Sequence, residues 1–151
     1  MISLIIPFYN CASTAESTLF TVSRFISNYD KEQIEMIAVN DGSADNTLSV
    51  LKSYEGEKIK VVSYKENKGK GGAIKSGVFA ASGDKIIFTD ADLAYGLSPI
   101  EPCAKALEEY DIAAGSRRSD KEILKSYGFL RNFSSRIFSA VCEFLLHLDI
   151  N

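Results

Sequence analysis

The chain has few of the residues that support a disulfide framework, a zinc site or histidine-dependent catalysis. Its 151 residues include three cysteines and one histidine. Cys11, Cys103 and Cys142 are odd in number and widely spaced, which argues against paired-cysteine sites and favours a reducing compartment. We expect Cys103, Cys142 and the histidine, His147, to have structural roles. The sequence therefore offers no Ser-His or Cys-His catalytic pair.

Excess positive charge and long uninterrupted apolar runs are also lacking. The formal net charge is −3 and no basic stripe is visible, which disfavours a nucleic-acid partner. The N-terminus has no basic leader. The one long apolar stretch, residues 133–150, carries Arg136, Glu143 and Asp149, a pattern that does not make a membrane span. We therefore expect this chain itself to be soluble, without a transmembrane segment.

The pattern that is present indicates one α/β domain over residues 1–151. A hydrophobic content of 46% and a charged content of 25% are ordinary for a globular protein. Short runs rich in Ile and Val alternate with helical patterns, which predicts right-handed crossovers and a mainly parallel sheet. The expected strands are residues 2–6, 34–39, 59–63, 85–89 and 111–114. The expected helices are residues 15–28, 45–53, 72–82, 99–109 and, in a final region, 123–148.

Polar residues follow every expected strand. In a parallel sheet the carboxyl ends of the strands meet at one edge, and ligands bind there. The segments that would reach that edge contain an aromatic residue, two turns with aspartates, a glycine-rich turn and a pair of arginines. The segments are residues 7–10, 40–43, 65–72, 90–92 and 115–118. Their convergence predicts a ligand site more strongly than any one of them.

Asp90 and Asp92 are the residues that indicate a specific chemistry most clearly. They flank the small residue Ala91 at the end of an expected strand, where a cation could hold a diphosphate. Hard carboxylate oxygens suit Mg²⁺ or Mn²⁺, which are commonly shared between protein and substrate phosphates. The alternative is a solvated turn in which one aspartate caps a helix.

Two further segments could contact a nucleotide. Asp41, at the end of the second expected strand, could accept hydrogen bonds from a ribose hydroxyl or a base N–H, whereas Asp45 and Gly42 look like a helix cap and a turn former. Residues 68–72 could direct backbone amides and a lysine at phosphates or a uracil carbonyl. This glycine run matches neither the P-loop nor the dinucleotide fingerprint, and ordinary loops have a similar composition.

Taken in order, these segments resemble the family-2 glycosyltransferases. Residues 2–10, residues 39–47 and Asp90-Ala91-Asp92 carry the likeness, which covers essentially the whole chain. Residues 67–73 and Gly115-Ser116-Arg117 are similar to the polyprenyl-phosphate branch, which includes dolichyl-phosphate glucosyl- and mannosyltransferases. The resemblance implies an α/β fold of the three-layer GT-A (Rossmann-like) type with a mainly parallel central sheet.

The resemblance also implies an activity and a set of site residues. The activity is inverting transfer of a sugar from a UDP-sugar to a polyprenyl or dolichyl phosphate at the cytoplasmic face of a membrane. Asp90 and Asp92 would be catalytic through a bound Mg²⁺ or Mn²⁺, and Arg117 and Arg131 would hold the acceptor phosphate. The implied donor-binding residues are Pro7, Tyr9, Asn10, Asp41, Ser43, Asn67, Lys70, Gly71, Asp90 and Ala91.

Two departures qualify the resemblance. Ala94 stands where mannose-type relatives often have glutamine, which favours glucose. The sequence stops at Asn151, before a segment that such relatives carry, so we expect a chain truncated at its C-terminus. The oligomeric state, including a homo-oligomer, stays open.

Two other functions remain alternatives. Transfer to a sugar hydroxyl would need a catalytic carboxylate beyond the metal pair, and none stands out after Gly115. A phosphate acceptor is already ionised and needs no general base. A non-catalytic nucleotide-sugar-binding module would keep Asp41 but would not require both Asp90 and Asp92.

Overall fold

The computed structural model describes residues 1–115, which form a four-stranded sheet with helices on both faces. The strand order is β3-β2-β1-β4, and every neighbouring pair is parallel. The elements in chain order are β1 (Ile2–Phe8), α1 (Ala12–Asn28), β2 (Ile34–Asp41), α2 (Thr47–Ser53), β3 (Ile59–Tyr64), α3 (Gly69–Ala80), β4 (Lys85–Phe88) and α4 (Ile100–Ala106). The expected α/β class with a mainly parallel sheet is confirmed.

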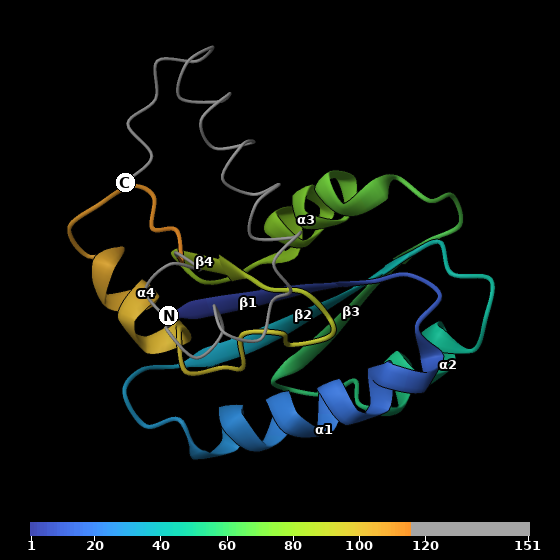
Figure 1. Cartoon of the computed structure of the whole chain (residues 1–151), viewed down its shortest axis with the longest axis horizontal. Helices are drawn as coiled ribbons and strands as arrows, with labels where there is room; N and C mark the ends of the chain where they lie inside the picture. Colours follow the sequence, from blue (N-terminus) through green and yellow to red (C-terminus); the bar gives the residue numbers. More distant parts are fainter. Residues whose placement is uncertain (116–151) are drawn as a thin grey trace, which may run out of the picture. The chain divides into compact units, whose positions relative to one another are not determined.

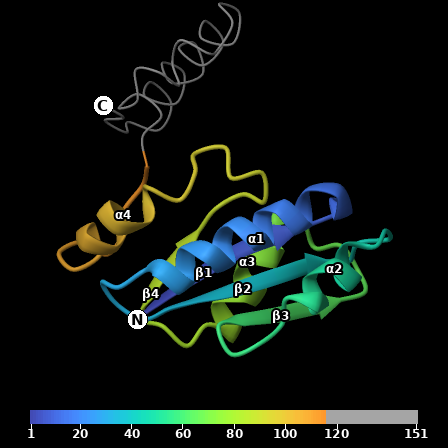
Figure 2. The same cartoon turned by 90° about the horizontal axis from the view of Figure 1, so that it is seen from below.

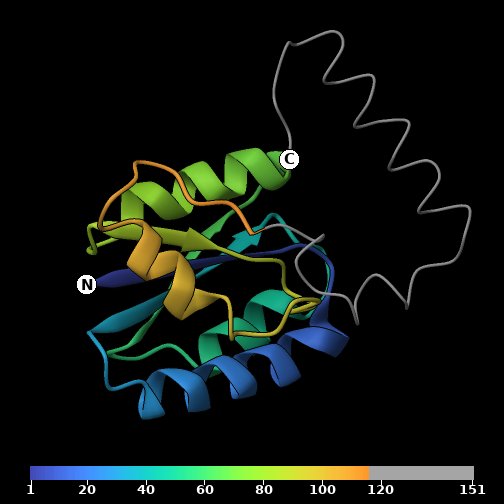
Figure 3. The same cartoon turned by 60° about the vertical axis from the view of Figure 1, so that its left-hand side comes forward.

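Three layers follow from the way β1 and β2 bury both of their faces. Figure 1 shows α3 on one side of the sheet and α1 and α2 on the other, and Figure 3 shows the same layers from another side. Leu4, Ile6 and Phe8 pack in the core cluster that includes α1, α2 and α4, whereas Ile5 packs in the cluster that includes α3. Burial on both faces explains why these strands are almost continuously apolar.

Small residues set how closely the helices approach the sheet. A Cβ atom at Gly77 of α3 would overlap the side chain of Ile5, so glycine allows the close contact. On the opposite face α1 and α2 lie side by side (Figure 2). No helix within residues 1–115 has the length and apolarity needed to cross a lipid bilayer.

The prediction of a fifth strand at residues 111–114 is wrong. Residues 111–115 form no strand, and Ile112 is 85% exposed. A run of Ile and two Ala is apolar but offers little side-chain area for burial, so apolarity alone could not place it in the sheet. The argument that placed Arg117 at a strand end therefore loses its structural support. The expected helix 123–148 lies outside the described residues.

All four described helices begin at other residues than the sequence predicts: α1 begins at Ala12 instead of residue 15 and α4 at Ile100 instead of residue 99. The starts of α3 and α2 have a clear cause. α3 begins at Gly69 instead of residue 72, so the glycine run forms the first turn of the helix and not a preceding loop. α2 begins at Thr47 instead of residue 45, because Asp45 lies in the turn before it. In both places side-chain acceptors hold the early backbone N–H groups, a capping arrangement that apolar periodicity does not reveal.

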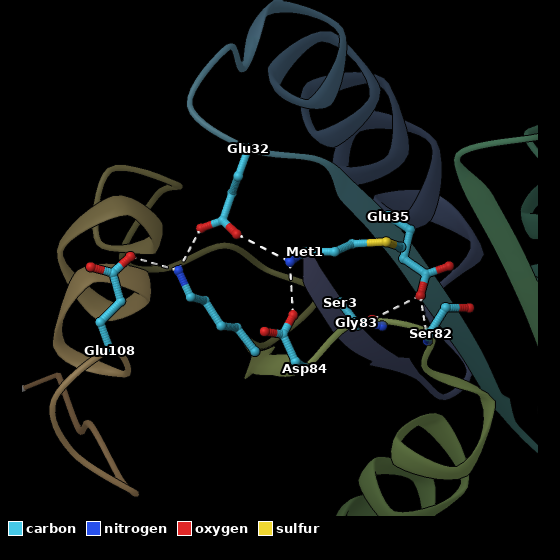
Figure 4. Close-up of polar contacts among 9 residues, drawn as sticks. Met1, Ser3, Glu32, Glu35, Ser82, Gly83, Asp84 and Glu108 are labelled. Carbon is cyan, nitrogen blue, oxygen red and sulfur yellow. Dashed lines mark hydrogen bonds and ion pairs between the residues drawn. The ribbon is translucent and has the colours of Figure 1, made fainter.

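A buried polar network ties together the amino ends of the strands (Figure 4). Ser3 and Glu35 are register partners on β1 and β2, and the Ser3 hydroxyl donates to Glu35 Oε1 over 2.7 Å. The backbone N–H of Ser82 donates to the same oxygen over 2.7 Å, and Lys60 Nζ lies 2.8 Å from Oε2. Glu35 is 4% exposed, so its charge is stabilised entirely by these partners.

This network makes stability depend on pH. Burial raises the pKa of the Glu35 carboxyl, but Lys60, the Ser82 N–H and the Ser3 hydroxyl outweigh burial and hold the pKa below its usual range. The stabilisation is therefore complete above the unfolded-state pKa of about 4.3 and is lost as the pH falls through the lower folded-state value.

Glu35→Gln should lower the free energy of unfolding near neutral pH by about 1–3 kcal/mol, because it removes the charge that satisfies three donors. Denaturant unfolding at pH 7 and pH 3 should show the difference shrinking in acid. Glu57→Gln, an exposed substitution with the same change in charge, should have no such effect. A loss for Glu35→Gln that stays constant with pH would contradict the role of the charge.

Candidate active site

The loops after β1 and β2 are joined at the carboxyl edge of the sheet. The backbone N–H of Asn10 donates to Ser43 Oγ over 3.1 Å, and Asn10 Oδ1 accepts from the N–H of Ala44 over 2.8 Å. Asn10 has a positive φ of 46°, a conformation that asparagine tolerates better than most residues. Two residues predicted to bind the donor, Asn10 and Ser43, therefore lie together. Tyr9, beside them in sequence, is exposed.

Asp45 has a structural role in the same junction. Its Oδ1 accepts from the N–H of Thr47 over 2.9 Å, and its Oδ2 accepts from the N–H of Ala12 at the start of α1 over 3.1 Å. The bonds from the Thr47 hydroxyl and N–H, and then that from Ala12, lower the pKa of the Asp45 carboxyl. The expectation that Asp45 is the helix N-cap is wrong by one residue, because the N-cap of α2 is Asn46. Asp45 instead holds the first N–H of α2 from the preceding turn, and it makes a second bond to α1 that sequence spacing does not show.

Asp41 is a buried carboxylate at the last position of β2, 3% exposed. Its Oδ1 accepts from the Tyr64 hydroxyl over 2.7 Å and from the backbone N–H of Lys68 over 2.8 Å. Burial and the neighbouring carboxylate raise the pKa of Tyr64 to about 12, so the phenol stays a donor. Within residues 1–115 no donor is bonded to Asp41 Oδ2.

Gly42 and Asn67 lock the turn after β2 to the start of α3. Gly42 has a φ of 67°, and a Cβ there would lie 2.7 Å from the backbone nitrogen of Asn67. The Asn67 side chain donates from Nδ2 to the carbonyl of Asp41 over 3.1 Å and accepts from the N–H of Gly69 over 3.0 Å. Only a residue without a Cβ allows this approach of two backbone segments.

An ion pair joins the first turn of α3 to the turn that carries Asp90 and Asp92, which we call the carboxylate turn. Lys70 Nζ lies 2.5 Å from Asp90 Oδ1, and the two side chains are 57% and 52% exposed. Gly71, also in the first helical turn, has open space around its Cα. Backbone N–H groups in a first helical turn lack partners within the helix and favour anions. Lys70 and Asp90, predicted to contact the same ligand, are therefore within reach of each other.

The carboxylate turn has a defined backbone. The N–H of Leu93 donates to the carbonyl of Asp90 over 3.1 Å, and the N–H of Ala94 donates to Asp92 Oδ1 over 3.1 Å. Asp90 and Asp92 are both exposed, and in the described residues no third Cys, His, Asp or Glu joins them in a cluster. Beside Asp92 lies a hollow of about 370 Å³, lined on the α1 side by the hydroxyl residues Ser17, Thr18 and Thr21.

The structure thus joins the predicted site residues in three groups: Asn10 with Ser43, Asp41 with Asn67, and Lys70 with Asp90. Pro7 lies in β1 opposite Val39 of β2. Arg117 and Arg131 lie outside the described residues.

Sequence reasoning missed two residues that hold this site, Tyr64 and Thr18. Tyr64 is the register partner of Asp41 at the end of β3. It could have been found by aligning the ends of the expected strands. Thr18 lies in the middle of α1, and no local signal in the sequence marks its contact with the carboxylate turn.

Comparison with known proteins gives the family that the sequence resembles, the family-2 glycosyltransferases. Residues 3–149 match the family described as Glycosyl transferase family 2. The chain is 31% identical over 160 residues to the dolichyl-phosphate beta-glucosyltransferase of Mus musculus, covering 95% of this chain and 49% of that protein. This chain belongs to glycosyl transferase family 2. It spans about half the length of that relative.

Solved structures of similar fold support the GT-A assignment. Glucosyl-3-phosphoglycerate synthase from Mycobacterium tuberculosis, in complex with UDP, matches with a TM-score of 0.56 and 27% identity, covering 74% of this chain and 41% of that one. A mannosyltransferase from Pyrobaculum calidifontis, in complex with GDP-Man and Mn²⁺, matches with a TM-score of 0.54 and 26% identity, covering 60% of this chain and 27% of that one. The expected GT-A fold is confirmed.

Proposed function

We propose that this chain is the nucleotide-sugar-binding catalytic part of a glycosyltransferase. In our proposal it transfers a sugar, glucose in the first instance, from a UDP-sugar to a polyprenyl or dolichyl phosphate with inversion, at the cytoplasmic face of a membrane. One observation carries the proposal: a buried carboxylate with an unbonded oxygen, the first turn of a helix with a lysine, and a carboxylate pair share one edge of the sheet. The activity of the mouse relative supports the choice of sugar and acceptor.

Asp41 would bind the nucleoside. Its Oδ1 is fixed by Tyr64 and Lys68, so the carboxylate cannot rotate freely, and Oδ2 can accept from a base N–H or a ribose hydroxyl. A ligand donor there would meet a charge already oriented by the fold, which limits the entropy lost on binding. Pro7, Tyr9, Asn10, Ser43 and Asn67, from the adjoining segments, would complete this part of the site.

The carboxylate pair fits a divalent cation. Asp90 and Asp92 supply hard oxygen ligands on an exposed turn, and two carboxylates leave room for water and substrate phosphates, the coordination that Mg²⁺ prefers. When bound, Mg²⁺ or Mn²⁺ would neutralise charge on the departing diphosphate. Lys70, the N–H groups of Gly71 and its neighbours, and the backbone of Ala91 would hold the diphosphate and add positive potential.

The acceptor side of the proposal rests on Arg117 and Arg131. A guanidinium holds a phosphate through two parallel hydrogen bonds, a geometry that lysine cannot supply. A polyprenyl phosphate is already ionised at neutral pH, so it could attack the anomeric carbon without a general base. The protein would then contribute positioning and charge stabilisation.

A panel of nucleotide sugars tests the donor assignment. Thermal unfolding should shift upward most with UDP-glucose, and only when Mn²⁺ is present, because ligand binding to the folded state stabilises it. A GDP-sugar that stabilises the protein more than any UDP-sugar would overturn the choice of donor. Stabilisation of equal size in a chelator would contradict the metal.

Arg117→Ala should lower the specificity constant for polyprenyl phosphate by about tenfold or more, because it removes a bidentate charge-assisted contact with the acceptor. The KM for the UDP-sugar should change far less, and Arg117→Lys should restore only part of the loss. Initial rates with each substrate varied separately would measure both effects. A change in the acceptor's specificity constant within about twofold would favour transfer to a sugar hydroxyl, because a surface ion pair is worth at most about 1 kcal/mol.

A further inference from the structure

We propose that Thr18 of α1 is a positioning residue for the Asp90–Asp92 turn, an inference that rests on the proposed function of that turn. Thr18 is 4% exposed, and its Oγ1 lies 2.5 Å from the carbonyl oxygen of Ala91, the residue between the two carboxylates. The two residues are 73 positions apart in the sequence. A single buried hydroxyl thus connects the first helix of the fold to the centre of the carboxylate turn.

The Thr18 hydroxyl has two acceptors within reach and one proton to give. The carbonyl of Thr14, one helical turn earlier, lies 3.0 Å from Oγ1, and the carbonyl of Ala91 lies 2.5 Å away. Threonine in a helix ordinarily bonds back to the carbonyl four residues earlier. Here the contact with Ala91 is the shorter of the two, so this threonine also bonds to a segment outside its own helix.

The other restraints on the turn are of a different kind. The bonds from Leu93 to Asp90 and from Ala94 to Asp92 lie inside the turn and shape it. The N–H of Thr89, just before the turn, donates to the carbonyl of Ile5 over 3.2 Å and holds the start of the turn on β1, but not against α1. The pair of Asp90 with Lys70 is half exposed and worth little in solvent. The Thr18 bond is part-buried and comes from a side chain that is 4% exposed, so it is less screened by solvent than the ion pair and a lost partner is more costly. It therefore fixes the turn against α1.

A fixed turn matters because the carboxylates must be in place before the cation and the diphosphate arrive. Residues that orient metal ligands without touching the metal typically change metal affinity by about 10–100-fold when they are substituted. Thr18 orients Asp90 and Asp92 through the backbone between them. Loss of the Thr18 hydroxyl should weaken Mn²⁺-dependent binding of the diphosphate, which needs both carboxylates. Binding of the nucleoside at Asp41 should not change.

Thr18→Val tests the anchor, because it removes the hydroxyl and nearly keeps the shape, and Thr18→Ser keeps the hydroxyl. Ser27→Ala is the control: Ser27 is exposed on the same helix, away from the carboxylate pair, and its hydroxyl donates to the carbonyl of Ser23 over 2.8 Å. Thr18→Ala is a second variant without a hydroxyl, in case the valine variant folds poorly.

Two measurements give the outcome. Amide hydrogen exchange without metal should become faster at Leu93, Ala94 and Gly96 in Thr18→Val, and stay unchanged in Thr18→Ser and Ser27→Ala. The Mn²⁺ concentration for half-maximal UDP binding should rise about tenfold in Thr18→Val, with uridine affinity in chelator unchanged. Unchanged exchange in both hydroxyl-free variants would overturn the anchor. Failure of the wild-type chain to bind UDP with Mn²⁺ would instead overturn the proposed function, and the exchange result would still decide the role of Thr18.

Discussion

Asp41→Ala is expected to lower both the affinity for uridine and the free energy of unfolding. The substitution leaves the Tyr64 hydroxyl and the Lys68 N–H without their acceptor in a buried place. Each lost bond to a charged acceptor is worth about 1.5–3 kcal/mol, and the two share one carboxylate, so we expect a total loss of about 2–4 kcal/mol. From the sequence alone the same substitution would be expected to leave the fold intact.

Asp41→Asn separates the two roles of this residue. An amide oxygen can still accept from Tyr64 and Lys68, so most of the stability should remain. The charge and the free carboxylate oxygen are lost, so uridine affinity should fall by about tenfold or more. Urea unfolding and calorimetry with uridine would measure the two quantities. Uridine affinity that is unchanged in a folded Asp41→Asn protein would reduce Asp41 to a structural residue.

Asp90→Asn and Asp92→Asn should each remove most Mn²⁺-dependent binding of UDP, because each deletes a charged ligand of the proposed cation. The transfer rate should fall by about 10²–10³-fold, the loss typical of removing one electrostatic stabiliser of a transition state. Both side chains are exposed, so thermal stability without ligand should hardly change. Asp90→Asn also releases Lys70, which Asp92→Asn does not.

The control for these variants is Asp30→Asn, an exposed aspartate after α1 with the same change in net charge. It should leave UDP binding and the transfer rate unchanged. Full Mn²⁺-dependent affinity in either site variant would show that the corresponding carboxylate is not a metal ligand.

The sheet was predictable from sequence because its central strands are buried on both faces. β1 and β2 read as continuous apolar runs, and the position of Asp41 directly after such a run was enough to place it at the ligand edge. The same reasoning failed for residues 111–114, where the apolar side chains are small and Ile112 is exposed. Apolarity predicts a strand only where there is a surface to bury it against.

The contacts that hold the site were not predictable in the same way. The bond between Tyr64 and Asp41 depends on the register of β2 and β3, and the bond between Thr18 and Ala91 depends on how α1 lies against a turn far along the chain. Neither depends on a local pattern. The start of α3 at Gly69 likewise follows from capping by Asp41 and Asn67 across the edge, because glycine itself disfavours a helix.

Calorimetric titration of UDP into this chain, in Mn²⁺ and in a chelator, tests the central claim most directly. Without a cation the two carboxylates repel the diphosphate, so we expect binding to be strong in Mn²⁺ and weak in chelator, with a difference of about tenfold or more. The same affinity in both solutions would contradict a metal-dependent nucleotide-sugar site at this edge of the sheet.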